Sequence, residues 1–163
     1  MMFRYACRTA LSGALVTLVA ASARAQSTTQ TASFAINAIN QIAFFGAPSL
    51  TVSTGIAGAA PSSATDATAT WAVTTNQSGA KITASIPSGM PAGVTLSSNL
   101  TAPSGATSSG FMPLGTVAVD LVTGLTKVAQ GALVVTYKLD ATPAAGVVSS
   151  SSRIVTYTIT GGT

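Results

Sequence analysis

Hydrophobic and polar residues alternate along most of the chain after its first 25 residues, and this alternation predicts β-strands. In the clearest run, Gly131–Asp140, one face consists of four apolar or aromatic residues, namely Leu133, Val135, Tyr137 and Leu139. Arg153–Thr160 follows after a connection rich in Pro, Gly and Ser and has the same period. β-Branched and aromatic residues suit a pleated surface with one buried side, so we expect these runs to be the two final strands of the fold.

Shorter runs of the same period predict further strands upstream. Ser33–Phe45 alternates but changes phase near Asn37–Asn40, which indicates a bulge or a break between two short strands. Thr68–Thr75 and Lys81–Ile86 are separated by the turn residues Asn76–Gly79, and this spacing predicts a hairpin. Other strands are expected around Leu50 and Val52, from Val94 to Leu100, and over Thr116–Val122.

About seven to eight short strands, with no convincing helix among them, indicate an all-β protein. Turn residues recur between the strands at short intervals, as they do in antiparallel sheets. The architecture that this spacing favours is an antiparallel immunoglobulin-like β-sandwich. We expect a single such domain over residues 26–163.

The first 25 residues have the pattern of a secretory signal peptide. Two arginines precede the short apolar stretch Leu11–Ala21, and a small-x-small pattern ends at Ala25. The apolar stretch is much shorter than the roughly 20 residues that a membrane-spanning helix needs. We therefore expect cleavage between Ala25 and Gln26, with export to the periplasm, the cell surface or the extracellular space, and no transmembrane segment in the mature chain.

Removing the signal peptide changes the charge of the chain. The formal net charge of +4 falls to +1, because three of the seven Lys and Arg residues lie before Gln26 and all three acidic residues lie after it. The four remaining cations form no basic cluster, which argues against nucleic acid as a partner. A surface with so little charge favours association between protein molecules.

The residue types of the mature chain restrict its chemistry. It contains no Cys, His or Glu, which excludes disulfides, a Ser/His/Asp triad, a thiol nucleophile and a histidine metal site. Its only carboxylates are Asp66, Asp120 and Asp140. We interpret Asp66 as a turn residue, and Asp120 and Asp140 as solvent-facing charges on strands; an acid pair would need the last two on neighbouring strands. We predict a protein that is not an enzyme, with no catalytic, cofactor-binding or metal site.

Three aromatic residues of the mature chain are candidates for a glycan-binding platform. They are Trp71, Tyr137 and Tyr157, and each shares its strand face with apolar neighbours. A sandwich of this kind commonly buries a tryptophan between its sheets. We therefore expect these three side chains in the core, with an exposed platform as the alternative.

Several segments resemble a group of poorly characterised bacterial secreted β proteins with immunoglobulin-like folds. The segments are Ser63–Trp71, which continues to Lys81–Ile86, then Met90–Leu96 and Leu133–Val148. In general build the chain is also similar to fimbrial-subunit and spore-coat-type proteins, although it lacks the cysteine pair that those subunits often have. The resemblance implies a structural role outside the cytoplasm and assigns no functional residue.

These observations lead to a first functional hypothesis, a non-enzymatic exported structural or surface protein that associates with itself or with other surface proteins as a fibre or coat subunit. In this hypothesis a terminal strand completes the sheet of a neighbour. The candidate segment is Ser33–Phe45, through Phe34, Ile36, Ile39, Ile42 and Phe44. The other interpretation of this segment is the first strand of its own domain.

The second hypothesis is a soluble secreted module that binds a glycan or a protein. Rigid β-sandwiches place recognition on the loops between their strands. The two longest loops expected here are Gly55–Asp66 and Ala102–Met112. The sequence alone does not decide between the two hypotheses.

Overall fold

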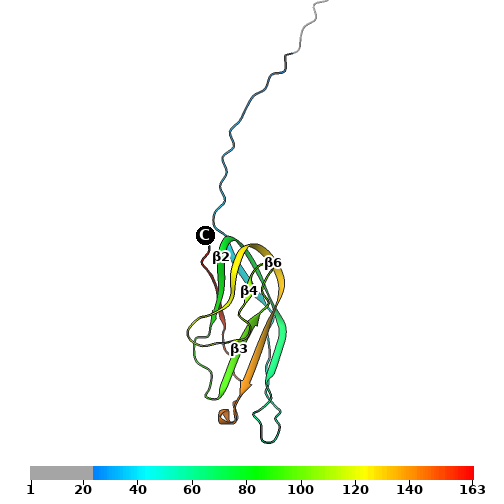
Figure 1. The fold of residues 1–163 in the computed structure, drawn as a ribbon, viewed down its shortest axis with the longest axis vertical. Coiled ribbons are helices and arrows are strands. Elements are labelled where there is room, and N and C mark those ends of the chain that lie inside the picture. The colour runs from blue at the N-terminus through cyan, green and yellow to red at the C-terminus, as the bar shows by residue number, and fades with distance from the viewer. Residues whose placement is uncertain (1–23) are drawn as a thin grey trace, which may run out of the picture. The chain divides into compact units, whose positions relative to one another are not determined.

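The computed structural model describes residues 24–163, which belong to two separate units (Figure 1). The described part of the first unit, residues 24–35, contains no helix or strand, and its side chains are exposed. The second unit, Ile36–Thr163, is the β-domain. The signal peptide predicted from the sequence lies outside the described residues up to residue 23, so it stays a prediction.

The β-domain is all-β, as the alternation predicted, and its strands form one seven-stranded antiparallel sheet. Its only helical turn within residues 36–163 is Pro143–Ala145. The strands are β1 (Asn40–Phe45), β2 (Ala64–Ser85), β3 (Val94–Leu100), β4 (Thr107–Ser108), β5 (Met112–Pro113), β6 (Val119–Ala141) and β7 (Thr156–Thr160). The order is β1-β2-β6-β3-β5, with β4 paired to β6 and β7 paired to β2.

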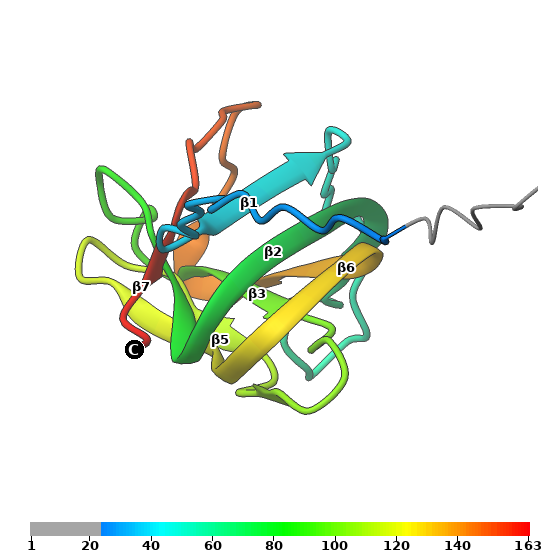
Figure 2. The ribbon, with the colours of Figure 1, turned by 90° about the horizontal axis from the view of Figure 1, so that it is seen from above.

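Two very long strands, β2 and β6, run antiparallel along most of their length and hold the sheet together (Figure 2). The first half of β2 also pairs with β1, and its second half pairs with β7. On β6, the second half pairs with β3 and the first half pairs with β4. Each long strand therefore serves two different neighbours, one after the other.

The hairpin predicted between Thr68–Thr75 and Lys81–Ile86 is wrong. The turn-like residues Asn76–Gly79 form irregularities within continuous β2, where the register with β6 shifts on either side of Ser78. Gly79 has a φ of +76°, and its N–H donates to Thr126 Oγ1 on β6. The chain does not reverse there because β6 continues alongside, so the extra residues are absorbed as a bulge.

The break expected in β6 between Thr116–Val122 and Gly131–Asp140 is absent for the same reason. Gly124, Lys127 and Ala132 all have positive φ values, yet β6 continues through them. A residue in the left-handed region is a common component of a β-bulge, which bends a strand without ending it. Sequence turn signals in this protein therefore mark bends of long strands.

The sheet curls around one apolar core. Phe44 on β1 and Tyr157 on β7 stack with ring centroids 3.8 Å apart, although they pair with opposite halves of β2. Trp71 is fully buried, as expected, and stacks on Phe44 with centroids 5.9 Å apart. The largest fully buried side chains also include Ile82, Ile86, Leu100, Leu121, Leu125, Val122 and Val135.

Three stretches that were predicted as strands lack regular pairing. Leu50 and Val52 lie in an irregular segment, β7 begins at Thr156 and not at Arg153, and residues 33–39 precede β1. Val117, within the strand predicted over Thr116–Val122, is 78% exposed and lies before β6. All of these residues have a strand-like pattern but no neighbouring strand to pair with.

Candidate functional site

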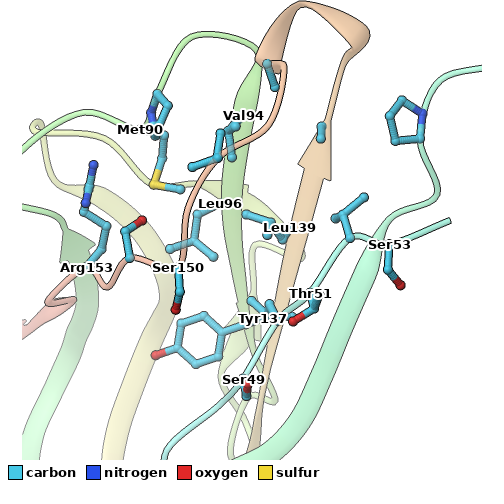
Figure 3. Close-up of a pocket in the computed structure, with 18 of the residues that line it drawn as sticks. Ser49, Thr51, Ser53, Met90, Val94, Leu96, Tyr137, Leu139, Ser150 and Arg153 are labelled. Atoms are coloured by element: carbon cyan, nitrogen blue, oxygen red, sulfur yellow. The ribbon is translucent and has the colours of Figure 1, made fainter. Parts of the chain in front are cut away.

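The described residues form a cleft of about 1110 Å³. Its floor comes from β3 and β6, and two irregular segments make its walls (Figure 3). One wall is residues 48–55, which follow β1 at a short distance along the chain. The other wall is residues 148–155, which lead directly into β7.

The floor is apolar. Leu96 on β3 lies opposite Leu139 on β6 in the sheet register, and Val94 and Tyr137 flank this pair. Leu96 and Tyr137 are buried, whereas Val94 and Leu139 are half-buried and line the opening. Trp71, by contrast, is fully buried and stacks on Phe44 of β1.

The first wall has the pattern of a strand without the pairing of one. Leu50 and Val52 are half-buried, while Ser49, Thr51 and Ser53 are exposed. Among the described residues, none donates or accepts a backbone–backbone hydrogen bond with residues 47–53. Within the described part of the chain, the backbone of residues 47–53 makes one hydrogen bond, from the Ser49 N–H to Asp66 Oδ2 at 2.9 Å, and the next residue of the wall, Thr54, accepts from the Ser62 N–H.

The second wall is similar. Residues 147–155 make no backbone–backbone hydrogen bond within the part of the chain that the structure describes. Arg153 and Val155 are half-buried and alternate with the exposed Ile154. Arg153 donates to the carbonyls of Ser152 and Gly89, at 2.9 and 3.4 Å, and it is the only charged residue that lines the cleft.

Two tyrosines form a polar cluster beneath the cleft. The hydroxyls of Tyr137 and Tyr157 lie 2.6 Å apart, and the Tyr157 hydroxyl also lies 3.2 Å from Ser98 Oγ. Burial raises the pKa of both tyrosines above the ordinary value, so both are neutral near pH 7. The cluster holds the floor together and offers no nucleophile or general base.

Each of the three carboxylates has a hydrogen-bond or ion-pair partner. Asp66 accepts from Thr68 Oγ1 at 2.6 Å and from the Ser49 and Thr68 amides, and these bonds lower its pKa. Asp140 accepts from Ser63 and pairs with Lys138. The hydrogen bond from Ser63, together with Lys138, lowers the pKa of Asp140. Asp120 pairs with Lys81 at 2.9 Å.

Asp120 and Asp140 lie near opposite ends of β6, so they do not form an acid pair. The described residues also contain no group of three or more His, Cys, Asp or Glu side chains that could hold a metal ion. Asp66, interpreted from the sequence as a turn residue, instead lies near the start of β2 and pairs with Tyr137, and it accepts from the Thr68 amide and hydroxyl two residues further on.

The structure divides the five residues of the candidate self-association segment. Ile42 and Phe44 belong to β1 and pack on the core of the domain. Phe34 and Ile36 precede β1 and are 92% and 81% exposed. Ile39 lies between the two groups, at 41% exposure, and its N–H donates to Asn76 Oδ1.

The loops proposed for a binding module are shorter than the sequence indicated. β2 begins at Ala64, and Gly55 and Pro61 form an isolated bridge that closes the first loop. The second loop contains β4 and β5. Trp71 is buried, so it is not an exposed glycan platform.

Sequence reasoning missed the cleft itself. The available signal was the strand-like alternation around Leu50 and Val52, which the sequence analysis assigned to a paired strand. Comparison with known proteins adds nothing to this site, because no family model, no curated protein and no solved structure matches the chain. In the described part of the chain, no helix has the length and apolar character needed to cross a membrane.

Proposed function

We propose that the mature chain is an exported, non-enzymatic structural subunit with an immunoglobulin-like β-sandwich, and that it assembles with copies of itself at the cell surface or outside the cell. The observation that carries the proposal is the exposure of Phe34 and Ile36 on an extended segment that leads into β1. Two large apolar side chains at a period of two, held in water, are a typical feature of a strand that pairs with another chain.

The composition of the chain supports the same function. The segment from Gln26 to Thr65 contains no charged residue, so charge repulsion does not oppose its packing against a second copy. The mature chain also lacks the residue types on which most hydrolytic and redox enzymes depend. A structural subunit that only assembles does not need those residue types.

The test measures the mass distribution of the natively exported mature protein, by light scattering and negative-stain microscopy on one sample. We expect ordered polymers from the unmodified chain and a monomer from a Phe34→Ser/Ile36→Ser variant. A Val117→Ser variant is the matched control, because it removes an equally exposed apolar side chain elsewhere. A clean monomer from the unmodified chain would exclude self-assembly.

The cleft favours a second candidate function, a secreted binding module. Its volume is slightly above the usual upper limit of small-molecule sites, and its walls carry many hydroxyls. For this function, the unmodified chain should be a monomer that binds a glycan or peptide with residues of the cleft. A glycan array probed with the unmodified chain and with a Leu139→Asp variant tests it, since only a cleft ligand would be lost on that change.

A further inference from the structure

We propose that the cleft is an acceptor site for a β-strand and that its occupant is the segment around Phe34 and Ile36 from a second copy of this chain. This proposal rests on the proposed function, because it names the surface at which one subunit receives the next. Four observations carry it: the unpaired walls, the apolar floor, the pattern and charge of the segment, and the distance to the cleft within one chain.

The walls are two strand-like stretches that lack partners. Residues 49–53 alternate half-buried and exposed side chains, as a strand at the edge of a sheet does, and residues 153–155 continue the alternation of β7. Neither residues 49–53 nor residues 153–155 make a backbone–backbone hydrogen bond with any described residue. Free N–H and C=O groups on a strand edge are a template on which an added strand pairs.

The floor between the walls matches one face of a strand. Leu96, Leu139 and Val94 present apolar surface to the opening, and the floor contains no charged side chain (Figure 3). A strand in the cleft would turn alternate side chains toward this surface and the others toward water. The occupant must therefore be apolar at a period of two and uncharged.

The segment around Phe34 meets both requirements. Phe34, Ile36 and Ala38 alternate with Ser33, Ala35 and Asn37, and the segment has no charge. In one register Phe34 and Ile36 pack on the floor, while Ser33 and Asn37 face outward. Arg153 donates to the carbonyls of Ser152 and Gly89, so its guanidinium has hydrogen-bond acceptors within the described part of the chain when an uncharged strand lies in the cleft.

A chain cannot place these two side chains in its own cleft. The carbonyl of Asn37, at the C-terminal end of this segment, accepts from the side chain of Asn76. This bond holds Asn37 beside a residue that lies beyond the middle of β2. The cleft floor at Leu139 lies opposite Ala64, at the beginning of β2, so the separation along the strand is roughly 30 Å or more. Phe34 is three residues from Asn37 and reaches only about 10 Å from it.

The test uses the absence of cysteine from the mature chain. Single-cysteine variants are made at Ala35, at Ser151 in the second wall, and at Val117 as a control site outside the cleft. A chain with Ala35→Cys is mixed with an isotope-labelled chain carrying Ser151→Cys or Val117→Cys, oxidised, and analysed by mass spectrometry. We expect disulfides between differently labelled chains for the Ala35 and Ser151 pair, and at least about tenfold fewer for the Ala35 and Val117 pair.

A charge in the floor gives an independent readout. Leu139→Asp should abolish assembly, whereas Val134→Asp, on the exposed face of the same strand, should not. A labelled peptide of residues 27–39 should bind the Phe34→Ser/Ile36→Ser chain, whose cleft is free, and bind the Leu139→Asp chain at least about tenfold more weakly. Circular dichroism and the buried Trp71 fluorescence report whether each variant is folded.

The outcomes separate this proposal from the proposed function. Polymers that form normally with Leu139→Asp, or that give no disulfide between Ala35 and Ser151, would overturn the acceptor site and leave self-assembly standing. Peptide binding without polymers would retain the acceptor site and overturn the structural-subunit function. A double-cysteine chain, with Ala35→Cys and Ser151→Cys together, that forms its disulfide only within a single labelled chain would overturn the second copy as the occupant.

Discussion

The first half of β2 and the wall at residues 49–53 have the same local pattern and different surroundings. Both alternate covered and exposed side chains, with Trp71 and Val73 inside in one case and Leu50 and Val52 half-buried in the other. The first half of β2 pairs with β1 on one side and with β6 on the other. The wall pairs with nothing among the described residues.

This difference shows what alternation does and does not specify. The period of two determines which side chains turn toward the apolar interior. Whether the backbone forms a strand depends on a partner that supplies its hydrogen bonds, and the local sequence does not contain that information. Stability should therefore be uneven, high around β2 and low at the cleft.

The largest effect that this comparison predicts is at Trp71. Trp71→Ala leaves a cavity at the best-paired part of the sheet and should lower the free energy of unfolding by about 3–5 kcal/mol in denaturant titrations. Leu50→Ala in the wall, which removes a half-buried side chain, should cost far less.

Trp71→Phe sharpens the same test. The buried indole N–H of Trp71 has no hydrogen-bond partner among residues 24–163, so phenylalanine removes an unsatisfied donor while it keeps most of the packing. We expect Trp71→Phe to lower the free energy of unfolding much less than Trp71→Ala does. Equal losses at Trp71→Ala and Leu50→Ala would show that the two regions do not differ in stability.

The next effect concerns Tyr137 and Tyr157, where the core meets the cleft. Because burial raises the pKa of both hydroxyls, the neutral forms stabilise the fold fully below pH 10, and this stabilisation falls as the pH rises toward the folded-state values. Residues 26–163 contain no other tyrosine. Absorbance at the tyrosinate band should stay low near pH 11, where a free tyrosine is about nine-tenths ionised.

Tyr157→Phe is the control for the alkaline titration. It removes the hydroxyl that links Ser98 to Tyr137 and should cost about 1 kcal/mol of stability at neutral pH. Because the hydrogen bond with the Tyr157 hydroxyl lowers the pKa of Tyr137, the remaining tyrosine should then titrate at a higher pH than in the unmodified chain. Gradual ionisation near pH 10 without unfolding would contradict the buried cluster.

The sequence predicted the class of fold and most buried faces because these follow from alternation. Leu133, Val135 and Tyr137 are buried as expected, and so is Trp71. The prediction from the sequence failed where a strand far along the chain decides whether a segment turns or stays extended. Asn76–Gly79 reads locally as a turn, but β6 holds the chain extended through it.

The candidate site was predicted only in part. The sequence presents Ser33–Phe45 as one run, but Phe34 and Ile36 are exposed whereas Ile42 and Phe44 pack on the core. The division follows from the contacts of Asn76 with Asn37 and Ile39, which are distant from it in sequence. The cleft depends on the absence of a strand between two segments that are about 100 residues apart in sequence. No local pattern reports such an absence.

A smaller effect tests the bulges that let β2 and β6 stay long. Ala132 has a φ of +55°, which is strained for an L-residue with a side chain. Ala132→Gly should raise the stability by about 0.5–1 kcal/mol. Ala129→Gly, on the same strand, should lower it by a similar amount. The same sign for both variants in thermal unfolding would contradict the strained bulge.

The smallest expected effect is local to the cleft wall, where Asp66 accepts the one hydrogen bond that the backbone of residues 47–53 makes with other described residues. Hydrogen bonds from Thr68 and Ser49 lower the pKa of Asp66, so the bond from Ser49 is complete above the ordinary aspartate pKa and is lost only as the pH falls through the lower folded-state value. The Ser49 amide shift in NMR spectra should therefore titrate with a midpoint below about 3.9.

Asp66→Ala should raise the exchange rate of the Ser49 amide by at most roughly an order of magnitude, since one hydrogen bond is lost, and should leave exchange in the central part of β2 unchanged. Asp120→Ala is the matched control, because it removes an exposed carboxylate whose partner, Lys81, lies far from the wall along β2. If Asp66→Ala instead accelerates exchange throughout β2, the wall and the core unfold together, and the contrast between a paired strand and an unpaired one does not hold for this protein.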